Sequence, residues 1–119
     1  MVVGLGIDLV EIARIERAMR HKGFLERILT PLEQEFCVKP YQVAGRWAAK
    51  EAIAKAVGLS LTWQQVEILP DELGVPRVQV KSPHFDPGRL RIQVSITHER
   101  THAAAVAILE RIVYQAPNP

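Results

Sequence analysis

This sequence has very little cysteine and no long apolar stretch, and each absence narrows what the protein can be. Its single cysteine, Cys37, cannot form a disulfide within the chain, which favours a reducing compartment. No segment approaches the roughly 20 apolar residues of a membrane span. The N-terminal run lacks the basic start of a signal peptide and is interrupted by Asp8. We therefore expect a cytoplasmic protein without a membrane partner.

A strong charge imbalance is also missing. The net charge is +2, from 15 basic and 13 acidic residues, which is too balanced to predict a nucleic-acid partner. The basic residues are nevertheless concentrated near the N-terminus, at Arg14, Arg17, Arg20, His21, Lys22 and Arg27. This concentration fits an acidic docking partner, and it fits equally a helix face that is merely solvated.

The first half of the chain reads as one strand followed by helices. Residues 2–10 are apolar and β-branched, which predicts a strand, and residues 11–22 have helical periodicity with Arg14, Arg17 and His21 on the polar side. Thr30 and Glu33 have the spacing of a capping box for a short helix. Residues 41–57 predict the longest helix, with a face of small residues that allows another element to approach closely.

The second half reads as strands. Short strands are predicted at 66–69, 75–81, 90–97 and 103–109, and the proline-rich residues 82–89 predict a loop. With 119 residues and 48% hydrophobic content, we expect a single domain over 1–119 with one core. Because helices come early and strands late, the fold class is α+β with a largely antiparallel sheet.

Two acids stand out as candidate metal ligands. Asp8 lies towards the end of the first strand, where it could also cap the following helix, and Glu51 lies in the long helix with Lys55 one turn later. If Asp8 and Glu51 met at about 4 Å, they would repel by about 4 kcal/mol at an effective dielectric near 20. Either a cation must then lie between them or one acid must stay protonated. Magnesium accepts one or two carboxylates together with waters and substrate phosphates. A surface Glu51–Lys55 pair is the simpler alternative.

Three further side chains could bind phosphate. Arg46 and Lys50 lie one turn apart on a flank of the long helix, and His98 ends the polar-alternating strand beside Ser95 and Thr97. Solvated surface charge explains Arg46 and Lys50 as well.

The segments Gly6-Ile7-Asp8 and Arg46-Trp47-Ala48-Ala49-Lys50-Glu51-Ala52-Ile53-Ala54-Lys55-Ala56 resemble the two signatures of the holo-acyl-carrier-protein synthases, which are small phosphopantetheinyl transferases. The later blocks 73–76 and 95–98 match the family in the right order. The resemblance implies the phosphopantetheinyl transferase fold and a homotrimer whose active sites lie between subunits. It also implies transfer of 4′-phosphopantetheine from coenzyme A to a serine of apo-acyl carrier protein, for fatty acid biosynthesis, with adenosine 3′,5′-bisphosphate as the other product.

The same resemblance implies residue roles. Asp8 and Glu51 would hold Mg²⁺ on the coenzyme A pyrophosphate, and Glu51 and Lys55 would be catalytic. Arg46 and His98 would bind coenzyme A, and the position of Lys50 one turn after Arg46 adds Lys50 as a candidate. Arg14 would bind the carrier protein, and the basic stripe that it shares with Arg17 and His21 adds these two residues.

Some positions depart from the family pattern. Trp47 replaces the usual phenylalanine, His102-Ala103 stands where tyrosine is frequent, and the loop 82–89 lacks expected glycines. These departures bear mainly on how adenine is recognised. Two other functions stay open on the residues alone, namely a non-catalytic basic module that binds an acidic protein and a magnesium-dependent pyrophosphate hydrolase.

Overall fold

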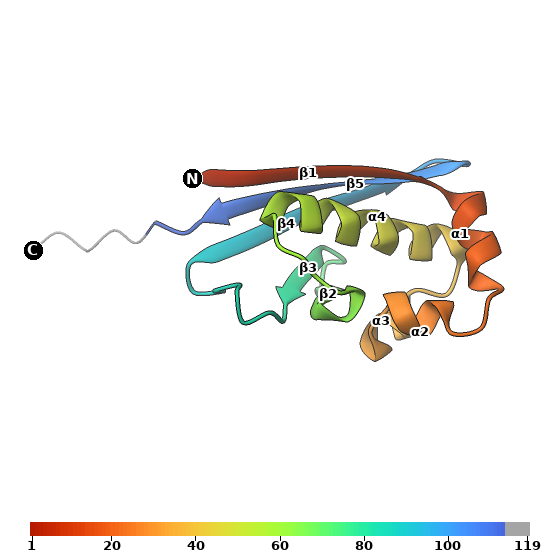
Figure 1. Ribbon diagram of the computed structural model, residues 1–119. Coiled ribbons are helices and arrows are strands. Elements are labelled where there is room, and N and C mark those ends of the chain that lie inside the picture. The colour runs from red at the N-terminus through yellow and green to blue at the C-terminus, as the bar shows by residue number, and fades with distance from the viewer. Residues whose placement is uncertain (114–119) are drawn as a thin grey trace, which may run out of the picture.

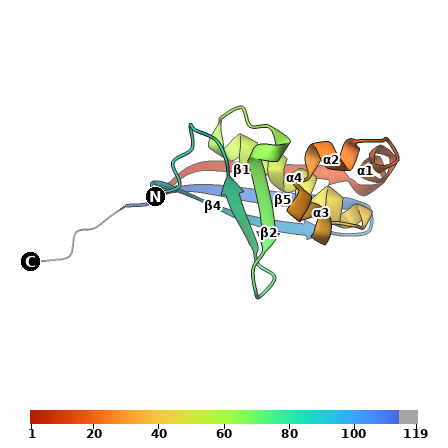
Figure 2. The same ribbon diagram turned by 90° about the horizontal axis from the view of Figure 1, so that it is seen from below.

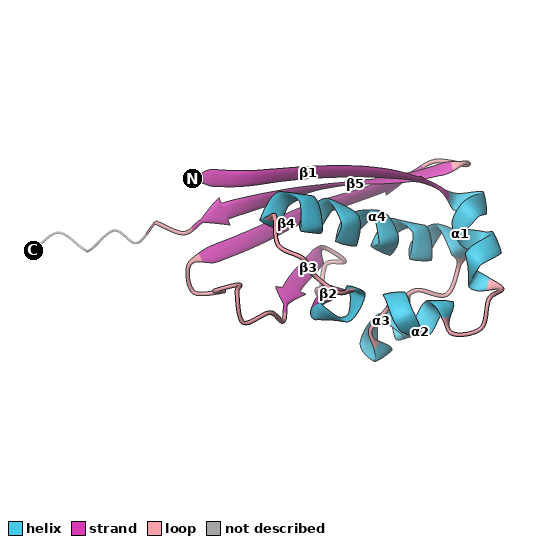
Figure 3. Cartoon of the chain, viewed as in Figure 1, coloured by secondary structure: helices cyan, strands magenta, loops and turns pink. Residues whose placement is uncertain are grey.

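The computed structural model describes residues 1–113 and shows the predicted α+β class (Figures 1 and 3). Its elements, in chain order, are β1 (Val2–Glu11), α1 (Ile12–Met19), α2 (Phe24–Ile28), α3 (Pro31–Phe36), α4 (Pro40–Val57), the 3₁₀ helix η1 (Trp63–Gln65), β2 (Val66–Pro70), β3 (Pro76–Val80), β4 (Leu90–His98) and β5 (His102–Arg111). Over residues 1–113, none of the helices combines the length and the apolar character that a membrane crossing requires.

Two antiparallel sheets account for all five of these strands. One sheet has the order β1-β5-β4, and the other is the hairpin β2-β3. Helix α4 packs along β1 and β5 and also reaches β4, while α1, α2 and α3 gather at one end of the sheet (Figure 1). Figure 2 shows the β2-β3 hairpin running across the direction of the larger sheet. The prediction of a largely antiparallel sheet is confirmed.

The contact between β1 and α4 is unusually close because glycines face small residues. A Cβ built on Gly6 would lie 1.9 Å from the carbonyl oxygen of Ala52, and one on Gly4 would lie 2.1 Å from that of Ala56. Only glycine fits at such an approach. The predicted small-residue face of the long helix therefore does permit close packing, and β1 is the element that uses it.

Helix ends follow the sequence signals in most places. Thr30 and Glu33 form the predicted capping box, and Gly58 ends α4 with a left-handed φ of 72°. Three expectations were wrong or incomplete. The strand ends at Glu11, one residue beyond the predicted range 2–10, and Glu11, not Asp8, is the N-cap of α1. Helix α1 stops at Met19 instead of residue 22, and α2 and η1 were not predicted.

Over β1 and β5, the face of the larger sheet that points away from α4 is apolar, and no part of residues 1–113 covers it. Leu5, Ile7 and Leu9 of β1 are 67%, 68% and 66% exposed, because alternate strand residues point to opposite faces and Gly6, Asp8 and Val10 take the side of the helix. Val106 and Ile108 of the neighbouring strand β5 lie on the same outer face. We call these five side chains the outer sheet patch.

Candidate active site

Asp8 and Lys55 meet where β1 runs beside α4. The Lys55 ammonium donates to the backbone carbonyl of Ile7 at 2.9 Å and lies 3.3 Å from Oδ1 of Asp8. The Asp8 carboxylate is 17% exposed, whereas the Lys55 side chain is 54% exposed. Asp8 is therefore held in a fixed place by the strand, and Lys55 reaches it from the helix while its ammonium stays accessible to a ligand.

The register of β1 on α4 places Glu51 at the same edge. Gly4 lies against Ala56 and Gly6 against Ala52, so Asp8, two residues further along the same strand face, is level with the turn that precedes Ala52. Glu51 belongs to that turn and lies one turn before Lys55, on the same side of the helix. Among residues 1–113, no hydrogen bond or ion pair engages the Glu51 carboxylate, so both of its oxygens are available.

These donors fit magnesium better than a transition metal. Asp8 and Glu51 offer carboxylate oxygens, the ligands that Mg²⁺ prefers, and Mg²⁺ usually keeps several waters and binds substrate phosphates. The described part of the chain contains no cluster of three or more His, Cys, Asp or Glu side chains that could hold a metal ion. A site of two carboxylates is thus suited to an ion whose remaining ligands are waters and substrate phosphates.

Lys50 does not have the exposed place that phosphate binding requires. Its side chain is 2% exposed, and its ammonium donates to the carbonyls of Ile28 at 2.8 Å and Trp63 at 2.9 Å and to Oε1 of Glu33 at 2.6 Å. All three N–H donors of the ammonium are occupied. Burial lowers the pKa of Lys50, and the Glu33 carboxylate opposes that shift. The prediction that Lys50 binds coenzyme A is corrected: it is a buried structural cation.

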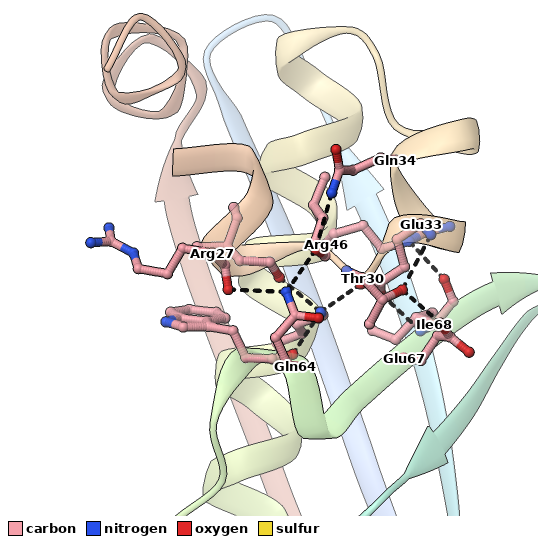
Figure 4. Close-up of polar contacts among 12 residues, drawn as sticks. Arg27, Thr30, Glu33, Gln34, Arg46, Gln64, Glu67 and Ile68 are labelled. Carbon is pink, nitrogen blue, oxygen red and sulfur yellow. Dashed lines mark hydrogen bonds and ion pairs between the residues drawn. The ribbon is translucent and has the colours of Figure 1, made fainter. Parts of the chain in front are cut away.

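Glu33 and Thr30 complete this buried polar cluster, which Figure 4 shows. Oε1 of Glu33 also accepts from the backbone N–H of Thr30, at 2.8 Å, and its Oε2 accepts from that of Ile68, also at 2.8 Å. The Thr30 hydroxyl donates to Glu67 at 2.6 Å. The capping residues predicted for α3 therefore also join it to β2 and, through Lys50, to α4.

Arg46 and His98 lie on the other side of α4, near β4. The Arg46 side chain donates from Nε to the carbonyl of Ile68 at 3.1 Å and lines a groove of about 340 Å³ with Pro70, Val75, Pro76 and Ser95 among others. A second groove of about 190 Å³ joins Arg46 to Tyr41 and His98, whose rings lie 4.6 Å apart. The structure thus brings Arg46 and His98 to one continuous surface.

The two halves of the predicted site face opposite ways within one chain. Nine residues, or about two and a half turns, separate Arg46 from Lys55, so the two side chains leave α4 on opposite sides. Lys55 contacts β1 and Arg46 lies near β4, and these are the two edge strands of the larger sheet. Asp8 and Lys55 therefore lie at one edge of the larger sheet, and Arg46 and His98 lie at the other.

A third surface lies at the helical end of the molecule. A groove of about 410 Å³ has a floor of Phe24 and Trp47 and a basic rim. The rim consists of Arg14, His21, Lys22 and Arg27. We call this the basic groove. The predicted carrier-binding residues Arg14 and His21 belong to it, whereas Arg17 lies outside it, near Glu11 at 3.8 Å.

Comparison with known proteins decides the family. The sequence model of the 4′-phosphopantetheinyl transferase superfamily matches residues 4–108. This chain belongs to that superfamily. The match covers most of β1, all four α-helices, β2 to β4 and most of β5, so the transferase family accounts for nearly the whole fold.

Individual transferases of this superfamily agree over almost their full length. The holo-[acyl-carrier-protein] synthase of Exiguobacterium sp. is 44% identical over 120 residues, covering 92% of this chain and 93% of that protein. The corresponding synthase of Chlorobaculum tepidum is also 44% identical, covering 89% and 97%. The crystal structure of the Helicobacter pylori synthase in complex with coenzyme A superposes with a TM-score of 0.82 at 33% identity, covering 89% and 99%.

Some residues of these surfaces were not singled out from the sequence. Lys22 and Arg27 were noted only as part of the basic concentration, and Phe24 and Trp63 were not noted. Phe24 could have been noticed in the sequence, because it is a large apolar residue between the basic residues Lys22 and Arg27. Trp63 had none, because its contact with Trp47 depends on the chain returning from η1 to α4.

Proposed function

We propose that this chain is a magnesium-dependent holo-acyl-carrier-protein synthase that works as a homotrimer in the cytoplasm. It transfers the 4′-phosphopantetheine arm of coenzyme A to a serine of apo-acyl carrier protein. The observation that carries the site proposal is the contact between Asp8 and Lys55, on the side of α4 that also carries Glu51 one turn earlier. The single cysteine, Cys37, supports the choice of compartment.

The reaction forms one phosphorus–oxygen bond and breaks another. The serine oxygen attacks the phosphorus that carries the pantetheine arm, and the bond from that phosphorus to adenosine 3′,5′-bisphosphate breaks. Phosphoryl transfer of this kind depends on positioning and on neutralising charge. Magnesium, held by Asp8 and Glu51, would supply part of that neutralisation on the pyrophosphate.

The chain's own side chains supply the rest. The Lys55 ammonium is exposed enough to approach the pyrophosphate and neutralises charge that develops on the departing bisphosphate. The serine proton passes to Glu51, whose carboxylate has two oxygens and can bind a metal ion with one. Arg46 and His98 hold the phosphate groups of the nucleotide end in the grooves beside β4.

Two features of the single chain support the proposed trimer. The outer sheet patch exposes Leu5, Ile7 and Leu9, and a face of this kind is commonly covered by another subunit. The two halves of the coenzyme A site face opposite ways, so a ring of copies would bring the Asp8–Glu51–Lys55 edge of one chain to the Arg46–His98 edge of the next.

The basic groove is the proposed docking site for the carrier protein. Arg14, His21, Lys22 and Arg27 surround an apolar floor, so an acidic helix with one apolar side chain would match it in both charge and shape. Arg17 lies outside this groove and would contribute to attraction over a distance.

Intact-protein mass spectrometry tests the proposal. Purified protein with coenzyme A, Mg²⁺ and apo carrier protein should add one phosphopantetheine to the carrier, and chelation of the metal should abolish the addition. Glu51→Gln should lower kcat by at least a hundredfold while the protein stays folded. The control is Glu72→Gln, which makes the same chemical change at an exposed residue in the β2-β3 turn. No addition to any carrier of the same cell, or release of adenosine bisphosphate without a carrier, would contradict the proposal.

A further inference from the structure

Two side chains from different parts of the chain donate hydrogen bonds to carbonyls at the carboxyl end of helix α2. Lys50 of α4 donates to the carbonyl of Ile28 from the buried side. Gln64 of η1 donates from the outside to the carbonyls of Glu26 at 2.9 Å, Arg27 at 3.3 Å and Leu29 at 2.8 Å (Figure 4). The last carbonyls of a helix have no partners within the helix, and these two residues satisfy them.

Such support matters because α2 is too short to be stable alone. It has five residues, and its N-cap is Gly23, whose φ of 85° makes a sharp entry from the preceding turn. Isolated helices of this length do not persist in water, so external contacts must fix the position of α2. The helix carries Phe24 and Arg27, one from the floor and one from the rim of the basic groove.

The Lys50 ammonium also connects this helix to the catalytic edge. It donates to the carbonyl of Trp63, whose ring lies 4.5 Å from that of Trp47 in the groove floor. Glu51, the next residue of α4, lines a small pocket of about 40 Å³ together with Trp63. The buried ammonium of Lys50 therefore contacts Trp63, which packs against the groove floor, and Lys50 is adjacent in sequence to Glu51, the proposed metal ligand.

We propose that Lys50 and Gln64 are positioning residues for carrier binding: they fix α2, and with it Phe24 and Arg27, relative to Glu51. This inference rests on the proposed function. Glu33 supplies the charge that allows Lys50 to stay buried, because it accepts from the ammonium at 2.6 Å. Neither Lys50 nor Gln64 lines the basic groove, so both act through α2.

Steady-state kinetics on the full protein tests this inference. Gln64→Ala removes an exposed carboxamide whose two N–H donors serve three carbonyls, so the fold should survive, and we expect the KM for carrier protein to rise about tenfold. The KM for coenzyme A should stay within twofold of the wild-type value. Gln79→Ala is the matched control, because Gln79 is an exposed glutamine on β3 outside the basic groove. Lys50→Met, assayed below its melting temperature, should raise the KM for carrier protein more than Gln64→Ala does. It should likewise leave the KM for coenzyme A within twofold of the wild-type value.

Two further measurements separate positioning from a general loss of stability. Hydrogen exchange should accelerate at the Arg27 and Leu29 amides in Gln64→Ala but not in α4. The double variant Gln64→Ala with Arg27→Ala should raise the carrier KM no further than Arg27→Ala alone. A carrier KM within twofold of wild type in Gln64→Ala, or equal rises for carrier and coenzyme A, would overturn the inference. If Lys50→Met fails to fold, the KM values of Gln64→Ala alone decide whether the inference holds. A wild-type protein without transferase activity would instead reject the proposed function.

Discussion

The close contact of β1 with α4 makes Gly6→Ala the most informative single substitution. The added Cβ would lie 1.9 Å from the Ala52 carbonyl oxygen and 2.8 Å from its carbonyl carbon, and both are backbone atoms that cannot rotate away. Ordinary contact begins at 3.4 Å, so the strand and helix must separate by about 1.5 Å at this point. The substitution therefore acts directly on the spacing between the strand that holds Asp8 and the helix that holds Glu51 and Lys55.

Two effects of different size should follow. Overpacking of this kind costs about 1–3 kcal/mol and sometimes more. Since the unfolding entropy is about 2.1 cal/mol/K per residue, the melting temperature of a chain of this size should fall by roughly 4–12 °C. The catalytic effect should be larger, because a misplacement of about 1 Å can lower a rate by a factor of about 100.

The assay compares transferase activity with the folded fraction at 25 °C, measured by circular dichroism. We expect Gly6→Ala to remain mostly folded at that temperature and to lose at least about 99% of kcat. Gly88→Ala is the control, because its Cβ would meet only a side-chain oxygen of Asp86, at 3.2 Å, in an exposed loop. A Gly6→Ala variant with unchanged melting temperature and activity would refute the reasoning about the β1–α4 spacing.

Three more predictions concern other parts of the molecule. Ile7→Glu puts a charge in the outer sheet patch and should yield a folded but monomeric and inactive protein by size-exclusion chromatography; an active trimer would contradict the proposed interface. Hydrogen bonds from Thr101 and His102 lower the pKa of Glu99 from 4.5 to about 2, so its charge stabilises the fold above pH 4.5 and stops doing so as pH falls through 2. Glu99→Gln should therefore melt below wild type at pH 7, with the difference vanishing near pH 2; a constant difference would refute this. Burial raises the pKa of Cys37, so a thiol reagent should modify it at pH 7 only as fast as the protein opens, and immediate labelling of the native protein would argue otherwise.

Local sequence signals predicted the elements whose causes are themselves local. The capping box at Thr30 and Glu33, the left-handed Gly58 and the alternation in β4 each depend on residues a few positions apart, and each is present in the structure. The face of small residues on α4 was also predicted from the sequence. What the sequence did not show is that Gly4 and Gly6 would lie against it, because that pairing depends on how a strand crosses a helix 50 residues later.

Two side chains lie elsewhere than their helical positions suggested. Lys50 occupies a flank of α4 that the helical pattern marks as polar, yet Ile28 and Trp63 cover it from two distant segments and Glu33 neutralises it. Arg17 shares a helix face with Arg14 but turns towards Glu11 instead of lining the basic groove. Periodicity within one helix cannot anticipate contacts with residues outside that helix.

The central claim is that the carboxylates of Asp8 and Glu51 share one divalent ion on the coenzyme A pyrophosphate. A crystal grown with coenzyme A and Mn²⁺ in place of Mg²⁺ would test this most directly, since the anomalous signal locates the ion. The account predicts a single peak at about 2.1 Å from an oxygen of each carboxylate, with the pyrophosphate as a further ligand. A pyrophosphate bound elsewhere, or an ion that contacts neither acid, would contradict it.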